Sequence, residues 1–95
     1  MAAYAIAQLH ITDSEGFERY RPMVPPTLEV YGGRYVVRGG MHETLEGDRH
    51  PQRVVVIEFP SLERAKAWWA SEEYAEAKAL RQRSARTDLL IVEGI

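Results

Sequence analysis

Strand-like and helix-like segments follow one another along this sequence in the order β-α-β-β-α-β. Residues 3–11 alternate between two faces, as a strand does, and residues 34–38 and 52–59 are rich in β-branched and aromatic side chains. Apolar residues at helical spacing follow the first and the third of these strands, and a final apolar run lies at residues 89–92. A four-stranded antiparallel sheet with both helices on one face satisfies this order, which is the ferredoxin-like α+β arrangement.

Prolines and serines divide the two helical regions. The apolar stripe after the first strand contains three prolines, Pro22, Pro25 and Pro26. Because an interior proline removes a hydrogen bond and costs about 3 kcal/mol, we expect a helix over residues 13–21, an irregular joint over residues 21–25, and a second helix that begins at Pro26. In the other region Ser61 is a suitable helix cap and Ser71 is a second one, which predicts that this helix bends or restarts.

The expected sheet leaves one face without cover. We expect strands one and three to be central and parallel, with strands two and four at the edges. The face opposite the helices is then largely apolar, and monomers seldom expose large contiguous apolar patches. A chain of 95 residues has room for one domain with a thin core. We therefore expect a single domain over residues 1–95 that forms a homodimer, in which a second copy covers this face.

Composition excludes several classes of function. The chain has no cysteine, which excludes disulfides, thiolate catalysis and cysteine-held metal sites. Twelve Lys and Arg against fourteen Asp and Glu give a net charge of −2, which argues against nucleic acid and an anionic membrane as partners. The longest aliphatic run, residues 54–57, is too short to cross a membrane, and the first residues lack the charged region of a secretory signal. These features predict a cytoplasmic protein.

Short motifs distributed over the whole chain carry a resemblance to a known family. They are Val24-Pro25-Pro26-Thr27, Tyr31-Gly32-Gly33-Arg34-Tyr35, Val37-Arg38-Gly39-Gly40, Leu45-Glu46-Gly47-Asp48, Glu58-Phe59-Pro60-Ser61, Ala65-Lys66-Ala67-Trp68 and Glu73-Tyr74-Ala75-Glu76-Ala77-Lys78. Together they closely resemble domain-of-unknown-function family 1330. That family is similar in fold to the dimeric α+β barrels, in which two ferredoxin-like protomers place their sheets face to face, so the resemblance implies a homodimer. It implies no reaction, although the wider superfamily includes cofactor-free monooxygenases, muconolactone-type isomerases and haem enzymes.

Polar residues near one end of the expected sheet form a candidate catalytic site. With parallel central strands, His10, Arg38 and Glu58 approach a common cavity beside the helix N-termini. A hairpin centred on Gly47 also places Arg38 and Glu58 diagonally on one face, within reach of an ion pair. In this interpretation His10 is a general base, Arg38 or Arg34 holds a carboxylate or enolate, and Glu58 orients its neighbours. The alternative is an ordinary ion pair together with a solvated histidine.

Aromatic and basic side chains supply further candidates. The predicted ligand-binding residues are Tyr20, Arg34, Tyr35 and Trp69. Trp68 and Tyr74 are alternatives for the wall of a pocket, and Trp69 is favoured because it shares the face of residues 62–65. The basic run Lys78, Arg81, Arg83 and Arg86 is interpreted as structural, because cations complement the C-terminal end of a helix. Histidines and carboxylates crowd residues 42–50 without a recognised ligand spacing, so no metal and no cofactor are expected.

These observations lead to one main hypothesis and two alternatives. The main hypothesis is a small cytoplasmic homodimer that binds an anionic or carbonyl-bearing metabolite and catalyses an isomerase-like proton transfer without a cofactor, with His10 as base. The first alternative is a non-catalytic module for small-ligand binding or assembly. The second is a cofactor-free monooxygenase.

Overall fold

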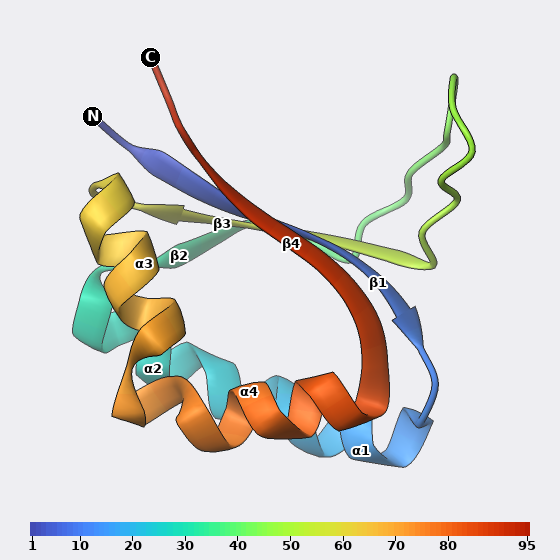
Figure 1. The fold of residues 1–95 in the computed structure, drawn as a ribbon, viewed down its shortest axis with the longest axis horizontal. Helices are drawn as coiled ribbons and strands as arrows, with labels where there is room; N and C mark the ends of the chain where they lie inside the picture. Colours follow the sequence, from blue (N-terminus) through green and yellow to red (C-terminus); the bar gives the residue numbers. More distant parts are fainter.

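The computed structural model describes all 95 residues, and its elements follow the expected order (Figure 1). The elements are β1 (Ala3–Ile11), α1 (Ser14–Tyr20), the 3₁₀ turn η1 (Arg21–Met23), α2 (Val24–Tyr31), β2 (Arg34–Arg38), β3 (Arg53–Phe59), α3 (Leu62–Ala70), α4 (Glu72–Ser84) and β4 (Ala85–Glu93). None of the helices is long and apolar enough to span a membrane.

The four strands form one sheet in the order β2-β3-β1-β4, and every neighbouring pair is antiparallel. Strands β1 and β3 are central, as expected, but the prediction that they are parallel is wrong. The first helical region returns the chain so that β2 has the direction of β1, and the reversal between β2 and β3 then turns β3 the other way. The C-terminal end of β1 therefore lies beside the N-terminal end of β3. This single difference decides which polar residues meet.

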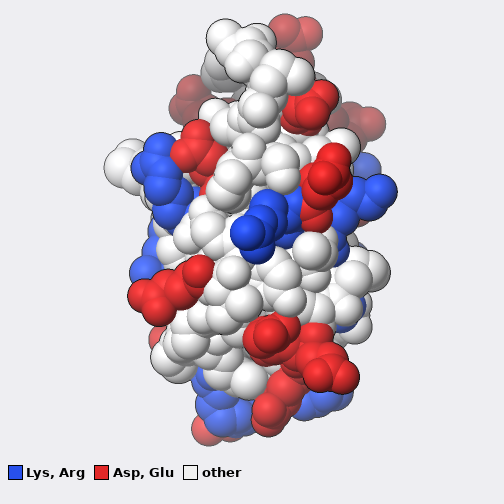
Figure 2. Space-filling view, turned by 90° about the vertical axis from the view of Figure 1, so that its left-hand side faces the viewer, with Lys and Arg blue, Asp and Glu red and all other residues white.

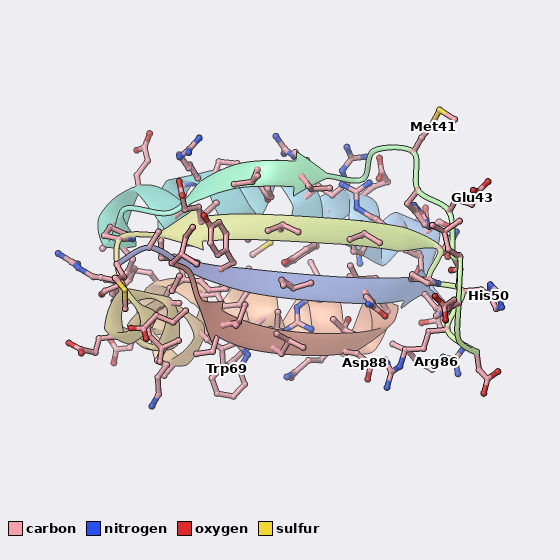
Figure 3. All side chains as sticks on the ribbon, turned by 90° about the horizontal axis from the view of Figure 1, so that it is seen from above. Met41, Glu43, His50, Trp69, Arg86 and Asp88 are labelled. Carbon is pink, nitrogen blue, oxygen red and sulfur yellow. The ribbon has the colours of Figure 1, made fainter.

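All the helices lie on one face of the sheet, and the other face is uncovered (Figures 1 and 3). Alternate residues of β1 point toward the helices and are buried, as Ala5 and Leu9 show. On the uncovered face of β4, Leu90 is 57% exposed and Val92 is 45% exposed. The final strand was expected to be short and buried. It is instead longer, and it is apolar on both faces although only one of them is packed within the protomer.

The first helical region is divided into two helices, α1 and α2, as the prolines predict. Asp13 caps α1 by accepting a hydrogen bond from the backbone N–H of Gly16, and the backbone remains helical through η1. The expected irregular joint is thus a single 3₁₀ turn containing Pro22. The second helix begins at Val24 rather than at Pro26, and Pro25 and Pro26 take its second and third positions, where a backbone N–H has no partner within the helix.

The second helical region restarts where the sequence indicates. Ser61 caps α3 and Ser71 caps α4, each by accepting a hydrogen bond from a backbone N–H three residues later. Helix α4 then leads into β4 without an intervening loop. Because the helix restarts, α4 lies across the sheet. Its residues Tyr74 and Arg81 then face the inner side of the sheet.

The core between helices and sheet is built around an aromatic stack. Trp68 and Tyr74 stack with ring centroids 4.0 Å apart, and Phe59 lies 5.4 Å from Trp68. The indole N–H of Trp68 donates a hydrogen bond of 3.0 Å to Thr27, so the buried donor is satisfied. This stack forms the rear of the cavity described next.

Candidate functional site

A cavity lies between the inner face of the sheet and the helices, and we call it the helix–sheet cavity. It encloses about 40 Å³, and most of its lining is apolar, with Ala5, Leu9, Val55, Ile57 and Leu89 contributed by the strands. Residues of α1, η1, α3 and α4 complete the walls. An apolar cavity into which a few polar groups converge is the usual form of a small-molecule site.

Four arginines line this cavity, and no carboxylate does. They are Arg21, Arg38, Arg53 and Arg81. Only Arg21 forms an ion pair, with Glu18 at 3.0 Å, and the side chains of both partners are largely solvent-accessible. On the face of the molecule shown in Figure 2, by contrast, acidic and basic side chains are interspersed. The helix–sheet cavity therefore holds an excess of positive charge in a chain whose net charge is −2.

Arg53 reaches the cavity because it shares the inner face of β3 with Val55 and Ile57. Its Nε atom is buried without a hydrogen-bond partner, and its guanidinium lies 5.7 Å from the ring centroid of Phe17. Burial, and after it the charge of Arg21, lower the pKa of Arg53. Arg53 forms no ion pair with any carboxylate of the chain.

Gly39 makes room for the Arg53 side chain. This glycine has a φ of +73°, and a Cβ at its position would collide with the guanidinium of Arg53. Its backbone N–H donates a hydrogen bond of 2.9 Å to the carbonyl of Val54. This bond holds the residues after β2 beside the start of β3. The left-handed backbone favours a glycine here, and an added Cβ would force the flexible end of the Arg53 side chain to move.

A hydrogen-bonded network of two tyrosines and an arginine forms another part of the lining. The hydroxyl oxygens of Tyr20 and Tyr74 are 2.8 Å apart, and Arg81 Nε donates to the Tyr74 hydroxyl at 3.2 Å. Arg81 is only 5% exposed and has no carboxylate partner. Burial raises the pKa of Tyr20, followed by the influence of Tyr74, so its hydroxyl stays protonated and can donate a hydrogen bond.

Tyr35 also lines the cavity and contacts Arg38. Burial raises its pKa, while the charge of Arg38, whose guanidinium is 4.4 Å from the Tyr35 ring centroid, lowers it. Tyr74 and Arg53 also influence Tyr35, which places this side chain near both the tyrosines and the arginines of the cavity.

The predicted common site of His10, Arg38 and Glu58 does not form. Arg38 lines the cavity, but His10 and Glu58 belong to the outer face of the sheet and lie at opposite ends of it. His10 is exposed and pairs with Arg86 of β4, whereas Glu58 pairs with Tyr4 of β1. The prediction was wrong because it assumed parallel central strands, which would have brought the two C-terminal ends together.

The predicted ion pair of Glu58 with Arg38 is also wrong. A β-bulge between Tyr35 and Val37 shifts the register, so Glu58 lies opposite Arg34 and Arg38 lies opposite Val55. The Arg34–Glu58 pair at 2.6 Å is on the outer face, which removes Arg34 from the cavity.

Of the predicted ligand-binding residues, Tyr20 and Tyr35 line the cavity and Trp69 does not. Trp69 is 43% exposed, points outward beside the edge strand β4 (Figure 3), and has the ammonium of Lys78 3.8 Å from its ring centroid. Trp68 takes the inward position, because Ala65 and Trp68 share the buried face of α3.

Three arginines of the cavity, Arg21, Arg53 and Arg81, were not among the site residues predicted from the sequence. Arg53 could have been found from the alternation of β3, which places it on the face of Val55 and Ile57. Arg81 was interpreted as a cation at a helix end. Its spacing of seven residues from Tyr74, two helical turns, was the available signal that it shares the buried face.

The histidines and carboxylates of residues 42–50 belong to the segment between β2 and β3, which extends away from the body of the molecule (Figure 3). The His42 ring contacts the carbonyls of Gly40 and Pro51 at 3.3 and 2.6 Å. No three His, Asp or Glu side chains of the chain converge as a group that could hold a metal ion.

The chain matches the domain of unknown function DUF1330 over residues 2–95, and it therefore belongs to this family. The resemblance found in the sequence is thereby confirmed. No match to the chain was found among the curated proteins.

Solved structures show the same fold. A protein of unknown function from Rhodopseudomonas palustris has a TM-score of 0.79 and 21% identity, over 99% of this chain and 82% of that chain. A dimeric ferredoxin-like protein of unknown function from Jannaschia sp. CCS1 has a TM-score of 0.68 and 12% identity, over 99% of this chain and 100% of that chain. SnoaB, a cofactor-independent oxygenase from Streptomyces nogalater, has a TM-score of 0.60 and 9% identity, over 99% of this chain and 93% of that chain. The ferredoxin-like α+β fold is thus confirmed.

Proposed function

We propose that this member of the DUF1330 family binds a small anionic metabolite in the helix–sheet cavity. The observation that carries the proposal is the set of four arginines around an apolar cavity, of which only Arg21 has a carboxylate partner. A cation held in apolar surroundings without a partner is costly, so its presence needs an explanation other than stability. A bound carboxylate or enolate would supply the missing negative charge through charge-assisted hydrogen bonds.

The dimensions of the cavity support a small ligand. Its enclosed volume of about 40 Å³ holds only part of a ligand of several carbons, so the rest of such a ligand would extend outward. Arg38 and Arg21 lie at its border and remain accessible to solvent, so a longer molecule can extend outward past them. We expect compounds of a few carbons, and an aromatic or conjugated skeleton would pack well against the rings of Tyr35 and Phe17.

The same proposal favours binding over proton transfer by His10. The lining of the cavity contains no histidine and no carboxylate, the two side chains that most often act as general bases. His10 therefore has no part in the proposed site, and the non-catalytic binding module takes the place of the isomerase-like enzyme as the first candidate.

Oxygenation without a cofactor is the second candidate. SnoaB, which shares the fold, is a cofactor-independent oxygenase. Arginines that stabilise a substrate anion also suit a reaction in which that anion supplies electrons to O₂. Oxygen consumption in the presence of a ligand that binds would distinguish this candidate from a module that only binds.

We also propose that the protein is a homodimer with the two uncovered sheet faces in contact. Support comes from the exposed Leu90 and Val92 on this face and from solved structures of the same fold that are described as dimeric. Stable dimers bury apolar surface of this kind.

A binding assay with one charge-removing variant tests the proposed site. Short-chain carboxylates such as pentanoate would be titrated into the protein, with binding followed by thermal shift and by NMR. We expect Arg53→Met to weaken binding at least tenfold, because it removes a charge-assisted contact, while the melting temperature stays the same or rises. Arg83→Met removes an equal charge from the exposed face of α4 and is the matched control. Failure of every carboxylate to bind, or equal loss in both variants, would refute the proposed function.

A further inference from the structure

The polar groups of the helix–sheet cavity fall into two sets that differ in chemistry. One set, which we call the arginine end, consists of Arg38 of β2, Arg53 of the neighbouring β3 and Arg21 of η1, and after burial the charges of Arg21 and Arg38 lower the pKa of Arg53. The other set, the tyrosine end, consists of the hydrogen-bonded Tyr20, Tyr74 and Arg81. Tyr35 lies near both sets.

The two ends differ in exposure and in the chemistry that they offer. At the arginine end Arg38 is exposed, and Arg53 is half-buried with an Nε that has no partner. Two guanidinium groups without a bound carboxylate are suited to a fully charged, planar carboxylate, which accepts parallel hydrogen bonds from arginine.

The tyrosine end offers the neutral hydroxyl groups of Tyr20 and Tyr74 as donors, and the buried cation Arg81 is hydrogen-bonded to Tyr74. Because Arg81 donates to the Tyr74 oxygen, the Tyr74 hydrogen can be directed to Tyr20, which leaves the Tyr20 hydroxyl free to donate. The charge of Arg81, which is 5% exposed and has no carboxylate partner, strengthens that donation. Such a group suits an oxygen that carries partial negative charge, as in an enol, an enolate or a conjugated carbonyl.

We infer that the ligand of the cavity is a small oxo acid in its enol or enolate form, with its carboxylate at Arg53 and Arg38 and its enol oxygen at Tyr20 and Tyr74. This inference rests on the proposed function and adds the substrate class. The carboxylate would neutralise charge at Arg53 and Arg38, which have no ion-pair partner, and an enolate oxygen would bring negative charge toward Arg81. The flat, conjugated skeleton of an enolised oxo acid would lie against the apolar residues between the two ends.

Three five-carbon compounds separate the contributions of the two ends. The probe 2,4-dioxopentanoate carries both a carboxylate and an enol, pentanoate carries only the carboxylate, and 2,4-pentanedione carries only the enol. Dissociation constants would be measured by NMR titration of the full chain at fixed salt concentration. We expect 2,4-dioxopentanoate to bind at least tenfold more tightly than either of the other two, since it alone forms hydrogen bonds at both ends.

Two variants then test which part of the ligand each end binds. Arg53→Met should weaken 2,4-dioxopentanoate and pentanoate about tenfold and leave 2,4-pentanedione unchanged. Tyr20→Phe should weaken 2,4-dioxopentanoate and 2,4-pentanedione and leave pentanoate unchanged. Because Tyr20 is hydrogen-bonded to Tyr74, the melting curve of this variant would be recorded, and Arg83→Met would again serve as the control.

The outcomes distinguish the inference from the proposed function. If pentanoate binds as tightly as 2,4-dioxopentanoate and Tyr20→Phe changes neither, the tyrosine end does not recognise the ligand, and the inference is wrong while the anion site remains. If none of the three compounds binds, or Arg53→Met has no effect on any of them, both proposals are wrong.

Discussion

Arg34 and Glu58 form an ion pair across β2 and β3 on the face of the sheet that points away from the helix–sheet cavity. The guanidinium lies 2.6 Å from one carboxylate oxygen, and the Tyr4 hydroxyl donates to the other oxygen at 3.2 Å. Hydrogen bonding to Glu58 is also the main cause that raises the pKa of Tyr4. Glu58 is therefore occupied by neighbours from β1 and β2 and has no role in the cavity.

Glu58→Gln should leave ligand binding unchanged. The Arg34 side chain is 71% exposed, so we expect the lost ion pair to cost at most about 1 kcal/mol of unfolding free energy. Urea denaturation and pentanoate titration of the same variant would check the two expectations. A tenfold loss of pentanoate affinity would contradict the placement of Glu58 outside the site.

The order of the elements and the positions of their caps were readable from the sequence because they depend on local chemistry. Ser61 and Ser71 have side chains that satisfy backbone donors at a helix start, and this holds whatever the helices pack against. Strand register was not readable. The bulge between Tyr35 and Val37 moves Arg38 to the inner face and brings Arg34 opposite Glu58, and no residue type marks it unambiguously.

Only part of the candidate site was predicted from the sequence. Tyr20, Tyr35 and Arg38 were named as site residues, and all three line the cavity. Arg53 and Arg81 were missed because charged residues are seldom expected on a buried face. The spacing of residues along the sequence does not show that both arginines face one cavity without a carboxylate beside them. That arrangement depends on how α4 crosses the sheet.

Gly39→Ala should impair ligand binding, whereas Gly47→Ala should not. Both glycines have positive φ, at +73° and +99°, so either substitution strains the backbone by about 1 kcal/mol. Only at Gly39 would the new Cβ also collide with Arg53, because nothing lies within 4 Å of a Cβ at Gly47. We expect a severalfold loss of pentanoate affinity for Gly39→Ala alone. Equal affinities in the two variants would show that the position of Arg53 does not matter.

Stability should fall at alkaline pH because of Tyr20. Burial raises the pKa of this tyrosine in the folded chain, so the folded state keeps its proton at a pH where the unfolded tyrosine, with a pKa near 10, loses it. The stabilisation is present in full below about pH 10 and is lost as the pH rises above it, by about 1.4 kcal/mol per pH unit. Urea denaturation at pH 8 and pH 11 would measure the loss. Tyr20→Phe should show a smaller loss between these two values, and an identical loss in both proteins would exclude Tyr20 as its source.

Leu90→Asp should prevent association without unfolding the protomer. Leu90 is 57% exposed on the uncovered face of the sheet, so an aspartate there stays solvated in the monomer but would be buried without a partner in a dimer. Light scattering at micromolar concentration should give twice the 10.8 kDa of one chain for the unaltered protein and one chain mass for the variant. Val30→Asp is the matched control, because Val30 is 53% exposed on the helical side and its substitution should leave the dimer intact. A mass of one chain for the unaltered protein, or a dimer that survives Leu90→Asp, would show that the second copy does not cover this face.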